Sequence, residues 1–388
     1  MSPSPGRVVL FGATGYTGRI TARTLVSSGT APVLVGRSRS SLDALASELD
    51  ALAPGGRPPK YELADASDPG SVRVLLHSPD DVLISTVGPF TQHGGAAVEA
   101  AVNAGAAYVD STGEPAFIKR IFEDYGPRAE STGARLLTAC GYDYVPGNLA
   151  AGILLDRLDE RGETATRVDV GYFISGPFSP SGGTLASAAG ILLEPSFALV
   201  DGKVVPQRSS ANVRSFQVGD QRRDGVSIGG TEHYALPRLA PKLLDVNVHL
   251  GWTGRWSKAA SAAGALASNA LQVPGMASAM GAVVRTALGG SSAKGPSPEQ
   301  RSSARSITIA EAFSSDGTRL ASVRVEGPNP YDLTGQLLAW AARMLSRRAE
   351  QRLGALGPID AFGLNALVSG CMALGLAEVD EDLASASD

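Results

Sequence analysis

Short apolar runs alternate with helical patterns from the N-terminus to Cys140. Six runs rich in β-branched and other apolar residues are predicted as strands: RVVLF, APVLVG, KYELAD, DVLIST, AAYVDS and ARLLTA. Between them, apolar positions recur at the helical period near Gly15–Ser28, Ser41–Leu52, Pro69–His77, Ala96–Ala104 and Pro115–Ser131. Strands that alternate with helices are typical of βαβ units, so this part of the chain predicts a doubly wound parallel sheet.

The pattern changes beyond Gly141. A helix is predicted near Gly147–Leu158, and longer alternations of apolar and polar residues follow at Arg167–Ile174, Val213–Val218, Leu243–Gly251, Ser303–Phe313 and Arg319–Glu326. Alternation of this length favours a mostly antiparallel sheet with one covered face. Helical patterns that would cover it lie near Thr184–Leu193, Ala259–Leu271 and Met276–Leu288, and the Ser-, Gly- and Pro-rich Gly289–Arg301 is predicted as a mobile surface loop.

Composition and charge narrow the class of protein. Apolar residues make up 43% of the 388 positions, charged residues 19%, and the net charge is −4, as in soluble globular proteins. No run of Lys or Arg supplies the positive surface that nucleic acid binding needs, so nucleic acid is not an expected partner.

Two further features bear on location. Cys140 and Cys371 are far apart and lack metal-ligand spacing, which indicates a reducing compartment and two buried thiols. The N-terminus reads as a first strand and lacks the pattern of a secretory signal, so a cytoplasmic location is expected. The uncharged Ala259–Val284 is interrupted by Pro274, which favours two packed helices over contact with a membrane.

The sequence GATGYTG carries a glycine motif between the first predicted strand and the first predicted helix. Gly12 permits the sharp turn, Gly15 lets the backbone approach a pyrophosphate, and Gly18 allows close packing of helix on strand. Donors around the helix N-terminus favour an anion, with Thr14, Tyr16 and Thr17 adding hydroxyl and backbone groups. A strand-to-helix turn that binds nothing is the alternative, but the motif in this context indicates a dinucleotide.

The end of the second strand indicates which dinucleotide. NAD-binding enzymes place a carboxylate there, whereas this chain has Arg37, followed by Ser38, Arg39 and Ser40. An arginine and hydroxyls suit the 2′-phosphate of NADP(H), which is therefore the predicted cofactor. A solvated arginine at a helix start is the alternative.

Two more strand ends line the same edge of the predicted sheet. Asp65 follows the third strand, where it either accepts a hydrogen bond from the adenine amino group or caps the next helix. A Gly-Pro turn follows the fourth strand and lets the chain pass close to the ribose and nicotinamide; its residues are Thr86, Val87, Gly88, Pro89 and Phe90.

The segments GATGYTGR, VGRS, STVGPF, YVDSTGE and CGYDYVPGNL, in this order, resemble the saccharopine dehydrogenase-like NADP-binding oxidoreductases. The trans-acting enoyl reductases of bacterial polyketide lipid synthesis form one branch of that group. SGGTLASA and NPYDLTGQLLAWAARML extend the resemblance, whereas FGLNALVSGCMALGL departs from the expected pattern. The resemblance implies a Rossmann domain, an inserted α/β domain and a C-terminal helix that returns to the Rossmann domain.

Together the patterns and the resemblance predict an α/β protein with a Rossmann doubly wound parallel sheet plus a second α+β domain. The NADP-binding domain is expected over residues 1–145, and a domain for substrate binding or homodimer formation over 146–328. Helices predicted at Leu333–Arg348 and Phe362–Leu374 fall within 329–375, and residues 376–388 form an acidic tail that is expected to be disordered.

The candidates for catalysis lie just past the last predicted strand of the first domain. No tyrosine is followed four positions later by lysine, so a Tyr-x-x-x-Lys pair is absent. Tyr142, Asp143 and Tyr144 are candidate proton donors, with a helix-entry turn capped by Asp143 as the alternative. His93 is a further candidate, with a helix-capping or simply exposed histidine as the alternative.

Other residues of the predicted pocket are weaker candidates. Glu114 follows the fifth strand and either faces the pocket or starts a helix. The segment Ser181, Gly182, Gly183 and Thr184 opens a predicted helix whose N–H groups suit a substrate carbonyl or anion, or only a helix cap. No cluster of His, Cys and Asp has the spacing of metal ligands.

Three functions are compatible with these residues. The first is an NADPH-dependent reductase acting on the C=C bond of an apolar, polyketide-type or carrier-borne substrate, as the sparse charge and small residues of Ala259–Leu288 favour. The second is a reductase or dehydrogenase acting on the C=N bond of a saccharopine-like imine. The third is a sensor or scaffold that binds NADP(H) without catalysis, which the missing Tyr-x-x-x-Lys pair allows.

Overall fold

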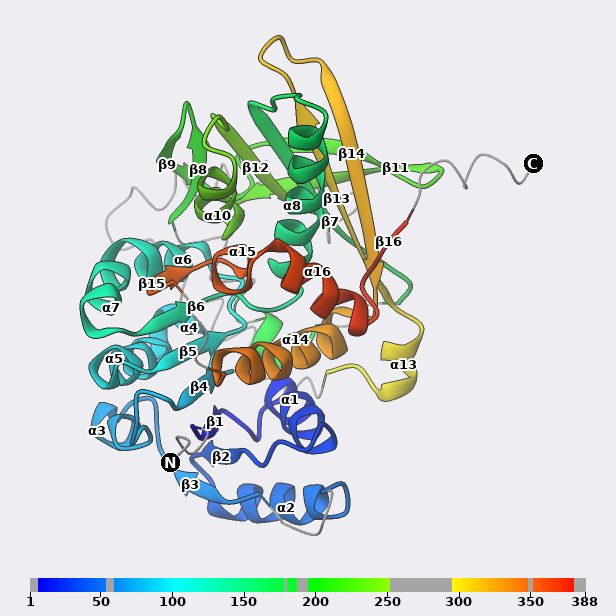
Figure 1. Ribbon diagram of the computed structural model, residues 1–388. Helices are drawn as coiled ribbons and strands as arrows, with labels where there is room; N and C mark the ends of the chain where they lie inside the picture. The colour runs from blue at the N-terminus through cyan, green and yellow to red at the C-terminus, as the bar shows by residue number, and fades with distance from the viewer. Residues whose placement is uncertain are drawn as a thin grey trace, which may run out of the picture. The chain divides into compact units, whose positions relative to one another are not determined.

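The computed structural model describes residues 6–53, 59–177, 180–185, 187, 195–251, 295–347 and 352–379 (Figure 1). The chain divides into two compact units, each with its own sheet. The first unit comprises Met1–Gly113, Phe117–Asp143 and Tyr331–Phe362, and the second comprises Glu114–Ala116, Tyr144–Pro330 and Gly363–Asp388.

The first unit is built on a seven-stranded parallel sheet in the order β15-β6-β5-β4-β1-β2-β3. Its strands are β1 (Val8–Phe11), β2 (Val33–Gly36), β3 (Tyr61–Leu63), β4 (Val82–Ser85), β5 (Ala107–Asp110), β6 (Arg135–Leu137) and β15 (Gly354–Leu356). Strands β1, β2, β4 and β5 are buried along their whole length, as expected where helices cover both faces of a parallel sheet. The doubly wound sheet predicted from the apolar runs is confirmed.

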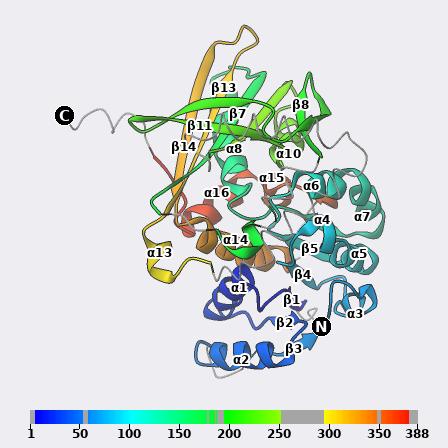
Figure 2. The same ribbon diagram turned by 180° about the vertical axis from the view of Figure 1, so that it is seen from behind.

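Helices flank both faces of this sheet, with α1, α2 and α14 on one side and α3, α5 and α7 on the other (Figures 1 and 2). The helices are α1 (Tyr16–Ser27), α2 (Arg39–Asp50), α3 (Pro69–Arg73), α4 (Phe90–His93), α5 (Gly95–Ala104), α6 (Pro115–Arg120), α7 (Gly126–Thr132), α14 (Pro330–Leu345) and α15 (Pro358–Phe362). This arrangement places the loops that follow the strands at one edge of the sheet, where doubly wound folds bind their ligands.

The single helix predicted over Pro115–Ser131 is interrupted in the structure. A π-helical turn, η1 (Ile121–Tyr125), separates α6 from α7. Pro127 at the start of α7 has no N–H to donate to the preceding turn, so the regular α-helical ladder cannot run through this point.

The last part of the chain returns to the first unit. Strand β15 pairs in parallel with β6, and Arg135 at the start of β6 donates to the carbonyl of Leu345 at the end of α14 (3.0 Å). The sequence predicts α14 but not β15, because three residues, Gly-Ala-Leu, carry no periodic signal of their own.

The second unit has a nine-stranded mixed sheet whose main path is β10-β11-β12-β7-β13-β14-β16. Its strands are β7 (Arg167–Ser175), β8 (Pro195–Val200), β9 (Lys203–Arg208), β10 (Val213–Val218), β11 (Gln221–Ile228), β12 (Asp245–Leu250), β13 (Arg305–Phe313), β14 (Arg319–Gly327) and β16 (Ala377–Glu378). Among the described strands of this sheet, only β12 and β7 pair in parallel, so the predicted α+β domain with a mostly antiparallel sheet is present.

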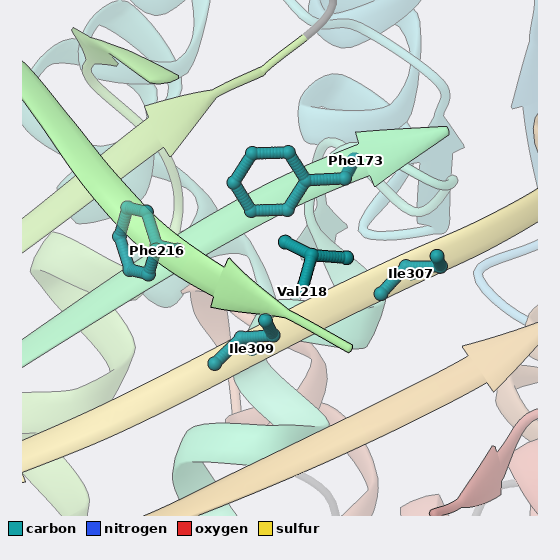
Figure 3. Close-up of a cluster of buried hydrophobic side chains, with 5 residues drawn as sticks. All are labelled: Phe173, Phe216, Val218, Ile307 and Ile309. Carbon is teal, nitrogen blue, oxygen red and sulfur yellow. The ribbon is translucent and has the colours of Figure 1, made fainter. Parts of the chain in front are cut away.

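The hairpin of β10 and β11 packs its apolar side chains against the sheet. Phe216 and Val218 of β10 lie against Phe173 of β7 and against Ile307 and Ile309 of β13, and all five are buried (Figure 3). The rings of Phe173 and Phe216 meet edge to face with centroids 5.7 Å apart, a favourable geometry for an aromatic pair.

Ion pairs fix the other end of the hairpin. Arg214 of β10 pairs with Asp169 and Glu311, which face each other across β7 and β13. The apolar cluster and these ion pairs together hold the β10–β11 hairpin on this face of the sheet. Helix α8 (Val145–Glu160) packs on β13 and β14.

The remaining described helices of the second unit are α10 (Glu232–Leu239), α13 (Pro298–Ser302) and α16 (Leu364–Ala373). Helix α13 overlaps the end of Gly289–Arg301, so the predicted loop is wrong from Pro298 on. A capping box formed by Ser297 and Gln300 starts the helix. The prediction of a disordered tail is also wrong at its start, because Ala377 and Glu378 form strand β16. Glu378 makes an ion pair with Arg157 (2.5 Å).

Some predictions lie outside the described residues. These are the helices at Ala259–Leu271 and Met276–Leu288, the first part of the loop Gly289–Arg301, most of Thr184–Leu193 and the end of the acidic tail. No helix in the ranges that the structure describes is long and apolar enough to span a membrane. Cys140 and Cys371 are both buried free thiols, as predicted.

Candidate active site

The glycine turn between β1 and α1 is held by backbone hydrogen bonds. The N–H groups of Gly12 and Ala13 both donate to the carbonyl of Val35 (2.9 and 3.1 Å). Gly12 has φ +87°, and a Cβ there would lie 2.7 Å from Thr86 Oγ1. The turn therefore requires glycine at this position for conformation and for space.

Gly18 and Gly15 differ in what surrounds them. A Cβ on Gly18 would lie 2.2 Å from the carbonyl oxygen of Gly12, so Gly18 allows α1 to pack on the turn. A Cβ on Gly15 would meet only that same oxygen, at 3.3 Å, among the described atoms, and Gly15 is exposed. The open side of the turn at Gly15 is thus free to receive a ligand.

The N-terminus of α1 suits an anion. Its N-cap residue is Gly15, no side chain caps the helix, and the first turn holds no acidic residue. Uncapped N–H groups and the helix dipole together attract a phosphate. Thr14 and Thr17 are half-buried beside this turn, while the ring of Tyr16 packs edge to face on Tyr331 with centroids 4.9 Å apart.

The residues after β2 have separate roles. Ser38 caps α2 by accepting a hydrogen bond from the N–H of Ser41 (3.3 Å). Arg39 donates to the hydroxyl of Tyr61 (3.2 Å). Arg37 is exposed and makes no hydrogen bond or ion pair within the described part of the chain, so its guanidinium is available to a ligand.

Asp65 follows β3 and does not cap the next helix, which corrects one of the two alternatives. Asp68 caps α3, whereas Asp65 accepts hydrogen bonds from the N–H (2.9 Å) and the hydroxyl (2.8 Å) of Ser67. These bonds lower the pKa of Asp65, and the positive charges of Arg37 and His93 lower it further. The ends of β2, β3 and β4 are therefore close enough for their charges to interact.

The turn after β4 is tied to the glycine turn. Thr86 donates from its hydroxyl to the carbonyls of Phe11 and Gly12, at 3.2 Å each. The peptide bond between Gly88 and Pro89 is cis, Gly88 is exposed and Val87 is half-buried. The buried ring of Phe90 packs on Phe117 (centroids 5.6 Å apart), and His93 ends the short helix α4 as an exposed side chain.

Asp110 at the end of β5 anchors the neighbouring loop, a role that the sequence analysis missed. Its carboxylate accepts hydrogen bonds from the N–H groups of Thr112 and Ala139 (2.9 Å each) and from the Thr138 hydroxyl (2.8 Å). Ala139 adopts φ 55°, which few non-glycine residues do. Burial raises the pKa of Asp110 to about 6 although these hydrogen bonds lower it.

Asp143 lies in the loop that Asp110 anchors. Its Oδ2 is 3.4 Å from the position that a Cβ on Gly113 would occupy, so the carboxyl sits where the loops after β5 and β6 meet. Its Oδ1 is buried and has no hydrogen-bond partner among the described residues. Burial alone raises the pKa of Asp143 to about 7.

The three candidates of the segment GYDYVPG differ in their surroundings. Tyr142 is buried, and its N–H donates to the hydroxyl of Thr334 in α14 (3.0 Å). Tyr144 is fully buried in the second unit, where its ring packs on Tyr172. The N-cap of α8 is Tyr144 and no side chain caps the helix, so the predicted capping role of Asp143 is wrong.

In the second unit, Ser181 accepts a hydrogen bond from the N–H of Thr184 (3.3 Å), as an N-cap does. Gly182 is half-buried and Gly183 is exposed in the same turn. Buried Glu114 does not merely start a helix, because it accepts a hydrogen bond from the hydroxyl of Ser187 (2.7 Å).

The second unit contains a buried polar cluster that the sequence did not predict. Tyr172 donates to Glu232 (2.5 Å) and accepts from the N–H of Gly147 (2.9 Å), while Asn148 donates to Thr231 (2.9 Å). The cluster ties the start of α8 to the start of α10. No group of three or more potential metal ligands occurs among the described residues.

The first unit is a dinucleotide-binding Rossmann domain, by its parallel sheet, its strand order and its glycine turn. Residues 8–136 match the family described as "Saccharopine dehydrogenase NADP binding domain". The match shows NADP(H) as the cofactor, and it agrees with the resemblance inferred from the motifs.

Curated relatives match about half of the chain or less. A protein of Mycobacterium tuberculosis named trans-acting enoyl reductase is 36% identical over 193 residues, which are 49% of this chain and 45% of that protein. A trans-acting enoyl reductase of Mycobacterium bovis is 37% identical over 164 residues, 42% of this chain and 39% of the relative. The match thus spans less than half the length of these relatives.

A solved structure resembles nearly the whole chain. It is the saccharopine dehydrogenase (L-Glu forming) of Saccharomyces cerevisiae, with a TM-score of 0.57 over 96% of this chain and 99% of the other. Its sequence identity of 13% means that the likeness concerns the fold alone.

Proposed function

We propose that this chain is an NADPH-dependent reductase that transfers hydride to the C=C bond of an apolar, polyketide-type or carrier-borne enoyl substrate. The observation that carries the proposal is Asp143, a half-buried residue of the unit that holds the NADP-binding turn, whose Oδ1 is buried without a hydrogen-bond partner among the described residues. Burial raises the pKa of this carboxyl to about 7. The names of the curated relatives, which match about half of the chain or less, support the enoyl substrate.

Asp143 supplies the proton in this reaction. NADPH, when bound, supplies the hydride to the β-carbon of the enoyl group. The C=C electron pair then moves toward the carbonyl, and the α-carbon needs a proton to complete the saturated product. The Asp143 carboxyl gives that proton, forms the new C–H bond and is left as carboxylate, which water reprotonates. A pKa near the working pH suits a general acid that must be reloaded in each cycle.

The cofactor-binding roles follow from the surroundings of each residue. Gly12, Gly15 and Gly18 shape the turn for the pyrophosphate, with backbone donors from Thr14 to Gly18 at the start of α1. Arg37 binds the 2′-phosphate, with Ser38 at the same helix start. Asp65 accepts from the adenine amino group, and the Thr86–Phe90 turn lies along the nicotinamide half.

The other candidates take lesser roles in this proposal. Tyr142 and Tyr144 are packing residues, because both rings are buried. No proton transfer is assigned to His93, which is an exposed side chain at the end of α4. Ser181–Thr184 remains a candidate contact for the substrate carbonyl, and a homodimer through the second unit and a cytoplasmic location remain predictions.

A C=N substrate is the second candidate, favoured by the match of residues 8–136 to the saccharopine dehydrogenase NADP binding domain. The same carboxyl would then protonate the imine nitrogen while its carbon receives hydride. The two candidates differ in the acceptor atom of the proton and in the substrate that is consumed.

The test is NADPH oxidation with two panels, enoyl thioesters of increasing chain length and imines formed from amino acids. The proposal expects oxidation with enoyl thioesters and its loss in Asp143→Asn, while the exposed Asp50→Asn keeps wild-type rates. Oxidation with imines alone would favour the second candidate. Binding of NADPH without oxidation by either panel would instead support the sensor.

A further inference from the structure

One face of helix α14 contacts the two loops that the proposed reaction needs. These are the glycine turn between β1 and α1 and the loop after β6 that carries Asp143. Tyr331, Thr334 and Gly335 stand three and four positions apart, so they share one face of the helix. This face belongs to the first unit although it lies 192 residues beyond Tyr142 in the chain and still further beyond Tyr16.

The first contact is with the cofactor-binding turn and its helix. The ring of Tyr331 meets the ring of Tyr16 at an interplanar angle of 83°, and Tyr331 is buried. One turn further along α14, a Cβ on Gly335 would lie 2.6 Å from Ile20 of α1, so the two helices touch at this glycine. The start of α14 therefore packs directly on the start of α1.

The second contact is with the loop that carries Asp143. Thr334 accepts a hydrogen bond from the N–H of Tyr142 (3.0 Å), the residue just before Asp143. A Cβ on Gly141 would lie 3.0 Å from the Thr334 methyl group, and the Cys140 thiol approaches the carbonyl of Leu337 at 3.9 Å. Three successive residues of the loop thus contact α14.

The loop is held at both ends. Asp110 fixes its start through the N–H of Ala139, and Thr334 fixes it at Tyr142. Asp143 follows Tyr142 directly, so the hydrogen bond from Tyr142 to Thr334 restricts where the carboxyl of Asp143 lies. The same helix that supplies the second anchor also supports the turn at Tyr16.

We propose that α14 is a positioning element that fixes the Asp143 loop relative to the cofactor-binding turn, with Thr334 and Tyr331 as its positioning residues. This rests on the proposed function, because it assigns α14 to the alignment of proton donor and cofactor. Thr334 holds the loop that carries Asp143, and Tyr331 packs on Tyr16 at the glycine turn. Replacing the two residues should therefore have separate effects.

The experiment compares Thr334→Val, Thr334→Ser, Tyr331→Leu and the control Thr24→Val, which removes a half-buried helical hydroxyl elsewhere in the first unit. Thr334→Val should lower kcat about 10- to 100-fold with little change in the Kd for NADPH, and Thr334→Ser should restore most of it. Tyr331→Leu should raise that Kd roughly three- to tenfold through loss of the ring contact. Thr334→Ala replaces the valine variant if the latter does not fold.

A second readout separates this inference from the proposed function. Carbon-13 NMR of the aspartate carboxyls, assigned with Asp143→Asn, follows the pKa of Asp143 without any substrate. In Thr334→Val the loosened loop should admit water and bring that pKa down toward its ordinary value. If the wild type reduces no substrate, the proposed function fails, and the NADPH Kd and the NMR titration still test α14. An unchanged Kd in Tyr331→Leu together with an unchanged pKa in Thr334→Val would overturn the inference.

Discussion

At the scale of single residues, the aspartates near the ends of β5 and β6 show how surroundings separate two identical side chains. Asp110 accepts three hydrogen bonds, whereas Oδ1 of Asp143 accepts none from the described residues. Burial raises the pKa of both, to about 6 for Asp110 and about 7 for Asp143. Asp110 therefore serves as an anchor, while Asp143 is free to exchange its proton.

Replacing Asp143 by asparagine should lower turnover and raise stability. Loss of a general acid typically lowers the rate about 10²- to 10⁴-fold. The pKa of Asp143 is higher in the folded than in the unfolded chain, so its burial destabilises the fold increasingly as the pH rises from about 4 to about 7. Urea unfolding of Asp143→Asn should show a gain of roughly 1–3 kcal/mol at pH 8 and none near pH 4. A variant that is less stable at pH 8 and fully active would contradict this role.

Arg37 should determine the preference for the phosphorylated cofactor. Arg37→Glu removes a cation and adds a charge that repels the 2′-phosphate, so the Kd for NADPH should rise about 10- to 100-fold while the Kd for NADH changes little. Arg39→Gln is the matched control, because Arg39 is bound to Tyr61. Fluorescence titration with NADPH and NADH measures both Kd values. An equal loss of affinity for NADPH in the Arg37 and Arg39 variants would argue against Arg37 as the residue that determines the cofactor preference.

The residues of the site were predictable to different degrees. Gly12, Gly15, Gly18 and Arg37 follow from a local motif, because a turn and a strand end are set by neighbours in sequence. The raised pKa of the Asp143 carboxyl depends on burial by distant residues, which no local pattern reveals. Asp110 and Thr334 were missed for the same reason.

At the scale of elements, the strength of the local apolar pattern determines which helices and strands the sequence predicts. Buried runs such as β1 and β4 are apolar throughout and stand out, whereas β9 is half-exposed, contains Pro206 and resembles a loop. Helix α13 is only five residues long within a Ser- and Pro-rich stretch, and its capping box was overlooked.

Two buried histidines should make the second unit sensitive to acid. Burial lowers the pKa of His233 to about 4 and that of His249 to about 3, below their value of 6.5 in the unfolded chain. The unfolded chain therefore takes up protons first, and stability is lost as the pH falls below about 6.5, at up to roughly 1.4 kcal/mol per pH unit for each histidine.

His233→Gln should flatten this dependence, since glutamine does not titrate. Urea unfolding at pH 4.5, 5.5, 6.5 and 7.5, spaced by ~1 pH unit across the transition, measures the slope. The exposed His77→Gln serves as control, and an equal slope in the wild type and His233→Gln would show that His233 does not contribute.

At the scale of the whole molecule, the first unit is completed by distant parts of the chain. Residues 331–362 add strand β15 to the sheet and helix α14 to the helices that flank it. The other strands of this sheet lie between Val8 and Leu137. The family model covers only residues 8–136, so it contains the cofactor turn but neither Asp143 nor α14. The proposed chemistry thus depends on segments outside the matched domain.

The most direct test of the proposed reaction follows the hydride itself. NADPH deuterated at C4 is incubated with the chain and an enoyl thioester, and the product is analysed by mass spectrometry and NMR. Reduction by this chain predicts one deuterium at the β-carbon, a solvent proton at the α-carbon, and no labelled product with Asp143→Asn. NADPH that binds tightly but leaves every enoyl thioester unlabelled would contradict the proposed function.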